Sequence, residues 1–215
     1  MIMDRASLFL FVKYPQEGKV KTRLGKQIGY DRAARFYREI AQTCVQRFSR
    51  IPGVDFTVYF DPPEEEERLR AWLGENFRYL AQPPGDLGER LQRGFAYWLP
   101  QRRRVIAIGS DSPDLPLEYI EQACDILLTK DAVIGPTEDG GYYLIGLSRF
   151  LPELFEGVPW STNEVLNVTR RKAVEIGASF ELLPKWYDVD TLEDLERWNV
   201  SNDKDWLSML ERIGE

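Results

Sequence analysis

Acidic residues that follow apolar segments are the feature of this sequence best suited to chemistry. The run 105–108 is apolar and rich in β-branched residues, and it leads through Gly109 and Ser110 to Asp111. A continuous apolar run of this kind is typical of a parallel strand that is buried on both faces. Because ligands of open parallel sheets bind outside the carboxyl ends of the strands, Asp111 is predicted to face a pocket.

Two other acidic groups have a similar placement. Glu138 and Asp139 follow the apolar run 132–135, and Asp188 and Asp190 follow the last predicted strand. Carboxylates without His or Cys nearby select a hard cation, Mg²⁺ or Mn²⁺, which one or two carboxylates hold together with the phosphates of a ligand. Simpler interpretations stay open: Asp139 could open an ordinary turn between two strands, and Asp190 could cap the next helix.

A cationic loop follows the predicted first strand, 7–12. It holds four basic residues and one central glycine: Lys13, Lys19, Lys21, Arg23 and Gly18. Lysine and arginine give charge-assisted hydrogen bonds to phosphate, and glycine lets the backbone come close, so the loop would suit a nucleotide. A solvated basic loop is the alternative. The glycine patterns of dinucleotide sites and Walker loops are absent, so neither NAD nor P-loop chemistry is indicated.

A second loop, 82–90, places two prolines and two glycines around Asp86 and Arg90. Asp86 or Gly88 can start the helix predicted over 89–98. Capping accounts for one residue, whereas the loop composition favours a segment that faces a ligand.

The segment Trp160, Ser161 and Thr162 precedes another predicted helix, which ends near residue 176. Ser161 or Thr162 would cap that helix. Trp160 could act as a lid or stack on a ligand, and an interior packing role is an equal alternative.

Composition excludes several functional classes. The 215 residues carry a net charge of −7, which argues against nucleic acid as a partner. The chain has no histidine, so Ser-His-Asp and Cys-His nucleophile systems are excluded. Cys44 and Cys124 match neither a metal nor a redox spacing, and reduced thiols are expected. Neither a membrane span nor a signal-peptide pattern is present, so a cytoplasmic protein is expected.

Strands alternate with helices along the whole sequence, which predicts an α/β three-layer sandwich with a mostly parallel sheet. Asp31 is expected to cap a helix over 31–48, and Asp114 another that ends near residue 128. One domain is expected over 1–215, with an amphipathic helical tail at about 203–215 that could support a homodimer.

Seven segments, in order along nearly the whole chain, resemble the bacterial DUF2064 family of glycosyltransferases. They are 11–15, 18–24, 85–90, 109–113, 139–146, 160–162 and 188–191. Members are described as nucleotide-diphospho-sugar transferases of the Rossmann-like GT-A fold, some linked to arsenosugar biosynthesis, and are similar to molybdenum-cofactor and phospholactate nucleotidyltransferases. The resemblance implies that Asp111 lies at the metal position and that Asp190 is the second metal-binding acid. Ser112 and Pro113 follow Asp111 in place of the usual Asp-x-Asp.

The first functional hypothesis is therefore metal-assisted transfer of a sugar from a nucleotide-sugar to a small-molecule acceptor. Lys13, Lys21 and Arg23 would surround the diphosphate and Asp86 would lie near the nucleoside. The acceptor or a lid would involve the remaining candidates: Glu138, Asp139, Gly140, Gly141, Trp160, Ser161 and Thr162.

Two alternatives remain open. A nucleotidyltransferase would join a nucleoside triphosphate to a phosphorylated small molecule and release pyrophosphate, and four cations in the first loop suit the larger charge of a triphosphate. A nucleotide-binding protein without turnover is the third hypothesis.

Overall fold

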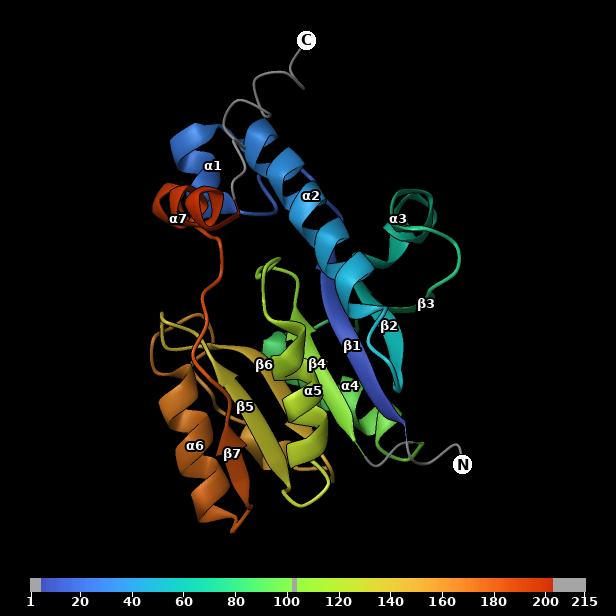
Figure 1. Ribbon diagram of the computed structural model, residues 1–215, viewed down its shortest axis with the longest axis vertical. Helices are drawn as coiled ribbons and strands as arrows, with labels where there is room; N and C mark the ends of the chain where they lie inside the picture. The colour runs from blue at the N-terminus through green and yellow to red at the C-terminus, as the bar shows by residue number, and fades with distance from the viewer. Residues whose placement is uncertain (1–4, 102–103, 203–215) are drawn as a thin grey trace.

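The computed structural model describes residues 5–101 and 104–202, and it contains a seven-stranded sheet in the order β3-β2-β1-β4-β6-β5-β7 (Figure 1). β6 pairs antiparallel with both β4 and β5, and the other pairings are parallel. The prediction of a mostly parallel α/β sheet is confirmed. The strands are β1 Ala6–Lys13, β2 Val54–Asp61, β3 Arg78–Ala81, β4 Val105–Gly109, β5 Ala132–Pro136, β6 Tyr142–Leu147 and β7 Phe180–Leu182.

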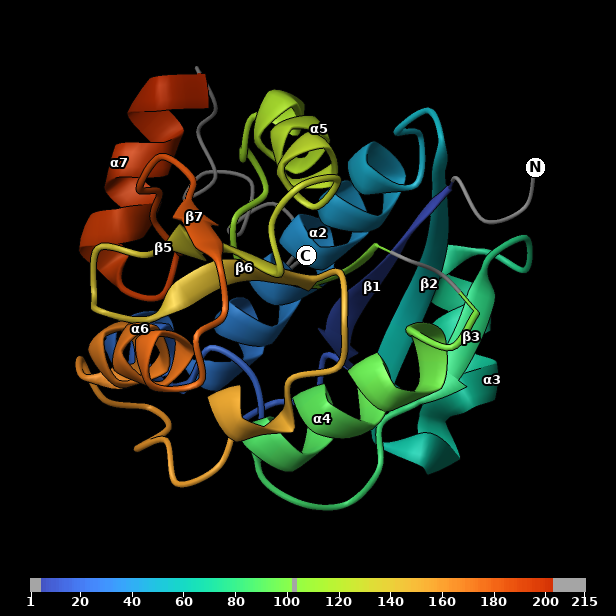
Figure 2. The same ribbon diagram turned by 90° about the horizontal axis from the view of Figure 1, so that it is seen from below.

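Helices cover both faces of the sheet. Figure 2 shows α2, α5 and α7 on one face, with α4 and α6 on the other. The helices are α1 Thr22–Ile28, α2 Tyr30–Phe48, α3 Glu66–Leu73, α4 Leu87–Trp98, α5 Leu117–Ile126, α6 Val165–Glu175 and α7 Leu192–Asn202, with short 3-10 turns η2 Pro63–Glu65 and η3 Pro152–Leu154. Within these described residues, no helix combines the length and the apolarity needed to cross a lipid bilayer.

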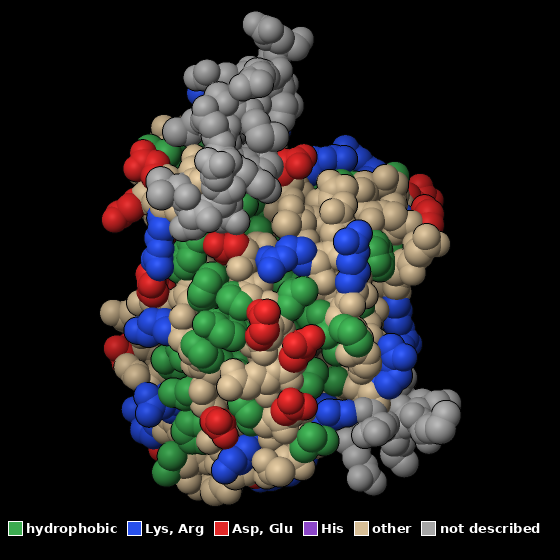
Figure 3. Space-filling model, in the orientation of Figure 1, with side chains coloured by type: hydrophobic (Ala, Val, Ile, Leu, Met, Phe, Trp, Pro, Cys, Tyr) green, Lys and Arg blue, Asp and Glu red, His purple; other side chains and the backbone are tan. Residues whose placement is uncertain are grey.

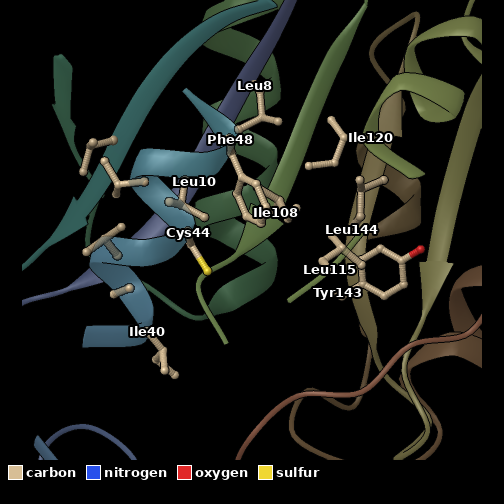
Figure 4. Packing of buried hydrophobic residues seen from close by; sticks show 14 of the residues in the cluster. Leu8, Leu10, Ile40, Cys44, Phe48, Ile108, Leu115, Ile120, Tyr143 and Leu144 are labelled. Atoms are coloured by element: carbon tan, nitrogen blue, oxygen red, sulfur yellow. The ribbon is translucent and has the colours of Figure 1, made fainter. Parts of the chain in front are cut away.

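The inner strand β1 is apolar from Leu8 to Val12, as expected for a strand whose side chains are buried on both faces of the sheet. Leu8 and Leu10 point toward α2, where they lie near Cys44 and Phe48 (Figure 4). Phe9 points to the other face and stacks on Trp98 of α4, with 4.6 Å between ring centroids. β1 therefore contributes side chains to the hydrophobic core on both faces of the sheet.

Helix α2 forms as its apolar spacing predicts, since the residues that it buries recur every three or four positions. Its N-cap is Gly29 rather than Asp31. Asp31 lies in the first turn, where a carboxylate is favoured by the helix dipole, and pairs with Arg35 one turn later. The expected cap was therefore wrong by two residues.

Two expectations about local structure were wrong for tertiary reasons. Residues 22–24, expected at the end of the cationic loop, instead begin α1, in which only Leu24 and Gly25 are buried. Pro116 lies at the N-cap of α5, and Asp114 does not cap it. The Asp114 carboxylate instead accepts hydrogen bonds from Tyr187 Oη at 2.5 Å and Trp186 Nε1 at 3.4 Å. The predicted tail helix at 203–215 lies outside the described residues.

Candidate active site

A cavity of about 710 Å³ opens at the carboxyl ends of β1 and β4. Parallel strands end on the same side of a sheet, so the loops that follow them converge there. The cavity is lined by four basic residues of the first loop and its neighbouring strand end, by the acids Asp61, Asp111, Asp188 and Asp190, and by aromatic side chains. The four basic residues are Lys13, Lys19, Lys21 and Arg23.

Lys21 lies at the centre of the charged groups. Its Nζ is 2.6 Å from Asp111 Oδ1 and 2.6 Å from Asp190 Oδ1. Only 2% of the lysine side chain is exposed, against 40% of each aspartate side chain. Since both oxygens contact one nitrogen atom, they lie at most twice that distance apart. The structure thus brings together two acids that are distant in the sequence.

The charges of this cluster stabilise one another. Burial alone would lower the pKa of Lys21, but the Asp111 and Asp190 carboxylates outweigh it and raise that pKa above its ordinary value. Burial acts on Asp190 in the direction of a higher pKa, and the charge and hydrogen bond of Lys21 reverse this, so its pKa is lowered. Lys21 is therefore an ammonium ion and Asp190 a carboxylate.

Asp188 differs from Asp190 in the direction of its pKa shift. Burial, followed by the negative charge of Asp111, raises the pKa of Asp188 to about 7. The Ser112 hydroxyl donates to Asp188 Oδ1 at 2.7 Å. Lys21 is thus paired with Asp111 and Asp190, while Asp188 is held by a neutral partner.

Helix packing explains why Lys21 and Asp190 meet. Lys21 directly precedes α1, and a single residue, Thr191, separates Asp190 from α7. The two helices lie side by side in Figure 1, and Leu192 N donates to Gln27 Oε1 at 3.0 Å. The interpretation of Asp190 as a helix cap is wrong, because Thr191 Oγ1 accepts from Asp194 N at 3.3 Å at this terminus, while Asp190 Oδ1 accepts from Lys21 Nζ.

Hydrogen bonds hold the segment around Asp111 in place. Val189 N donates to Asp111 O at 3.0 Å, which joins the end of β4 to the segment before α7. Tyr37 of α2 joins the ends of β1 and β4: its hydroxyl accepts from Lys13 N and bonds Ser110 Oγ, each at 2.9 Å. Tyr37 was not singled out from the sequence, since its spacing in α2 is that of a buried core residue.

The second loop is organised around Arg90. Its guanidinium donates to Gly85 O at 3.0 Å and Gln82 Oε1 at 2.8 Å, and lies 3.2 Å from Asp61 Oδ2. Arg90 lines the cavity, but these bonds direct it toward its own loop. Neither Gln82 nor Asp61 was singled out from the sequence, because their role depends on the position of Arg90.

Asp86 caps α4 instead of lining the cavity. Its Oδ1 accepts from Glu89 N at 2.9 Å, and Glu89 Oε2 accepts from Asp86 N at 2.9 Å. This is a capping box, which satisfies two N–H groups at the helix terminus. Gly88 also lies outside the lining, because it packs against Trp160: a Cβ here would be 2.7 Å from Trp160 Nε1. Gly18, with φ of 70°, is absent from the lining as well.

Glu138 and Asp139 lie outside the lining of the cavity. Glu138 forms a bidentate pair with Arg197 of α7, with distances of 2.8 and 3.2 Å. Asp139 Oδ1 accepts from Thr137 Oγ1 at 2.6 Å and Gly141 N at 3.1 Å. The segment is thus a turn, and its Gly140 leaves room for the loop before α6, since a Cβ there would be 2.2 Å from Asn163 O.

Among Trp160, Ser161 and Thr162, only Ser161 lines the cavity. Its φ is 64°, in the left-handed region. Trp160 packs edge-on against Tyr142 at 6.3 Å between centroids. The N-cap of α6 is Glu164, whose N–H donates to Thr162 Oγ1 at 3.3 Å.

The donor set bears on the expected divalent metal. In residues 5–101 and 104–202, no group of three or more His, Cys, Asp or Glu side chains is arranged to hold one. Asp111 and Asp190 offer two carboxylates, which fits Mg²⁺ or Mn²⁺ that takes its other ligands from phosphate and water. The residues therefore fit a cation that binds together with a substrate.

Solved structures share this fold. A protein from Desulfovibrio desulfuricans G20, provisionally described as a nucleotide-diphospho-sugar transferase, is 38% identical, with a TM-score of 0.87 over 93% of this chain and 88% of its own. The synthase of 4-diphosphocytidyl-2C-methyl-D-erythritol from Anaerococcus prevotii DSM 20548 is 13% identical, with a TM-score of 0.63 over 93% and 99%. A CMP-2-keto-3-deoxy-manno-octonic acid synthetase bound to CTP is 12% identical, with a TM-score of 0.60 over 92% and 98%.

Sequence families give a matching result. No curated protein matches the chain significantly. The model of DUF2064, described as an uncharacterized protein conserved in bacteria, matches residues 44–162. That segment includes Asp111 and the second loop, and the match covers more than half of the chain. The chain therefore belongs to the DUF2064 family.

Proposed function

We propose that this protein is a glycosyltransferase that moves a sugar from a nucleotide-sugar to a small-molecule acceptor with the help of Mg²⁺ or Mn²⁺. The observation that carries the proposal is the pairing of Asp111 and Asp190 through Lys21 beside a cluster of cations. The 38% identical relative from Desulfovibrio desulfuricans G20 supports it through its description. We place the reaction in the cytoplasm, as expected from the sequence.

The diphosphate is assigned to the cationic side of the cavity. Lys13, Lys19 and Arg23 line it, and each offers charge-assisted hydrogen bonds to phosphate oxygens. Asp111 and Asp190 would hold the cation. When bound, a divalent ion screens the charge on the departing diphosphate.

In the reaction, the bond from the anomeric carbon to the diphosphate breaks and that carbon bonds to the acceptor. The diphosphate leaves with the electron pair, and the acceptor loses its proton to a base. Since the chain has no histidine, this base is a carboxylate, a lysine, a tyrosine or water. Glu138 and Asp139 carry no role in the reaction here, because Arg197, Thr137 and Gly141 N occupy their carboxylates.

Nucleotidyl transfer is the second candidate function. Lys13 and three basic side chains of the loop that follows it line the cavity, which suits the charge of a triphosphate. Incubation of the pure protein with Mn²⁺, nucleotide-sugars or nucleoside triphosphates, and a panel of acceptors distinguishes the two. Release of nucleoside diphosphate that requires an acceptor and is lost in Asp111→Asn supports glycosyl transfer.

Three other results would contradict the proposal. Pyrophosphate release that requires a phosphorylated acceptor would establish nucleotidyl transfer instead. Thermal stabilisation by nucleotide-sugars without product from any acceptor would indicate a binding protein without turnover. If no nucleotide or nucleotide-sugar binds and no product forms, both candidate functions, glycosyl transfer and nucleotidyl transfer, are excluded.

A further inference from the structure

The ammonium of Lys21 occupies the place that a bridging metal ion would take. Its Nζ lies 2.6 Å from one oxygen of Asp111 and 2.6 Å from one oxygen of Asp190. Mg²⁺ would sit about 2.0–2.1 Å from carboxylate oxygens, in the same gap. A divalent ion on the outer sides of these carboxylates would still lie within a few ångströms of the ammonium and be repelled by it.

Several features hold Lys21 in this place. Its side chain is almost fully buried, and its ammonium contacts both carboxylates. Its backbone has φ 44° and ψ 46°, a left-handed conformation that non-glycine residues seldom adopt. Such backbone persists where surrounding contacts hold it, and the two ion pairs are contacts of this kind. Gly25 N also donates to Lys21 O at 2.7 Å, which anchors the residue to α1.

An anion bound in the cavity could compete with the two carboxylates for the Lys21 ammonium. Lys13, Lys19 and Arg23 line the same cavity, so an anion that binds there brings negative charge close to Lys21. Phosphate oxygens could then replace one or both carboxylates as partners of Nζ. The carboxylates left behind would need another cation, because unpaired neighbouring acids repel each other.

We infer that Lys21 is a tethered cation that keeps divalent metal off Asp111 and Asp190 until a phosphate-bearing ligand takes over its ammonium. Metal and nucleotide therefore bind together, each raising the affinity of the other. The inference rests on the proposed function for the identity of the ligand, a nucleoside diphosphate group. Its first consequence, exclusion of metal by the lysine, is independent of that ligand.

The first test measures Mn²⁺ affinity of the full-length protein without nucleotide, by electron paramagnetic resonance. Lys21→Met removes the charge, and Mn²⁺ is expected to bind at least about tenfold more tightly than to wild type. Lys21→Gln keeps N–H donors for the two carboxylates but removes the charge, so the same gain in Mn²⁺ affinity is expected. This variant replaces Lys21→Met in the test if the methionine variant does not fold. Lys21→Arg keeps the charge and the weak affinity of wild type.

Lys26→Met is the matched control. Lys26 is exposed in the last turn of α1 and is absent from the cavity lining, and its loss changes the net charge equally. It is expected to leave Mn²⁺ affinity as in wild type. The combination Lys21→Met with Asp111→Asn should lose the gain. Equal affinity in the Lys21 charge-removing variants and Lys26→Met, or a gain that survives Asp111→Asn, would overturn the inference.

A second test measures the coupling between Mn²⁺ binding and nucleoside diphosphate binding. In wild type, thermal stabilisation by Mn²⁺ with a panel of nucleoside diphosphates should exceed the sum of the separate effects, and this excess should be smaller in Lys21→Met. Equal coupling in both proteins would refute the role of Lys21. The first test uses no nucleotide, so a failure of turnover would end the proposed function without changing its result.

Discussion

Asp111 and Asp190 lie close together because the ammonium of a buried lysine lies between their carboxylates. Two carboxylates at this separation would repel each other, and Lys21 Nζ, 2.6 Å from each, turns that repulsion into attraction. All three side chains reach the cavity that also holds Lys13, Lys19 and Arg23. At the scale of single residues, the candidate site is this charged triad.

Asp111→Asn and Asp190→Asn test the acids. Each removes a carboxylate that would hold the cation, and kcat is expected to fall by about 10²- to 10³-fold, as when one preorganised charged contact is lost. Steady-state rates with the best nucleotide-sugar measure this. Asp31→Asn is the control, because Asp31 pairs with Arg35 on the exposed side of α2, and its activity should match wild type. Near-normal rates in both site variants would exclude the acids from the reaction.

Asp86 has a local role at the N-terminus of α4. Because its carboxylate caps the helix, Asp86→Ala is expected to lower the free energy of unfolding by about 1 kcal/mol. Urea denaturation measures the loss, and Asp86→Asn, which keeps a capping oxygen, should restore most of it. KM for the nucleotide-sugar should stay within twofold in both variants. A large rise in KM would show that Asp86 contacts the nucleoside.

At the scale of elements, Asp131 connects three parts of the sheet. It directly precedes β5, its Oδ1 is 2.6 Å from Arg149 Nε after β6, and its Oδ2 accepts from Ser179 N at 2.8 Å before β7. Hydrogen bonds from Arg149, followed by those from Ser179, lower the pKa of Asp131 to about 2. The ionised form therefore stabilises the edge of the sheet.

Asp131→Asn tests this link. The folded pKa is below the ordinary value of 3.8, so the stabilisation is present above that pH and is lost as pH falls toward 2. The variant is expected to lose about 1 kcal/mol at pH 7 after allowance for solvent screening. The difference should shrink at pH 2–3 in chemical denaturation. Asp31→Asn should show a smaller effect, and a pH-independent difference would contradict the ionic explanation.

At the scale of the whole molecule, α4 packs closely against one face of the sheet at Phe9 of β1. A Cβ on Gly94 of α4 would lie 2.8 Å from the Phe9 ring, which is already stacked on Trp98. On the surface, acidic and basic side chains are interspersed over the face seen in Figure 3.

Gly94→Ala should therefore destabilise the protein. A helical Gly→Ala change ordinarily stabilises, but here the overpacked ring is expected to cost about 1–3 kcal/mol. The control is Ala96→Gly at an exposed position of α4, which should cost about 0.5–1 kcal/mol through backbone entropy. Thermal denaturation measures both. A stabilised Gly94→Ala variant would mean that α4 is packed less tightly against β1.

The fold was predictable where local pattern and tertiary structure agree. Continuous apolar runs marked β1 and β4, and regular spacing marked α2. α1 was missed because only Leu24 and Gly25 of its seven residues are buried, which leaves no amphipathic pattern. Its existence depends on packing against α2 and α7.

The site was predictable in its residue types and less so in its pairings. Lysine is seldom buried, so nothing local indicates that Lys21 is enclosed between two acids. Glu138 follows a strand like the other acids, yet Arg197 takes its carboxylate, and that contact depends on where α7 packs. Asp114 fails as a cap for the same reason, because Tyr187 arrives from a distant segment.

We expect Asp111 and Asp190 to share one bound cation beside a nucleotide diphosphate. Anomalous diffraction from crystals grown with Mn²⁺ and the nucleotide-sugar that gives the largest thermal shift would locate that cation. One Mn²⁺ peak is expected in contact with both carboxylates, with Lys21 Nζ bonded to phosphate. A bound nucleotide-sugar whose Mn²⁺ contacts neither Asp111 nor Asp190 would contradict it.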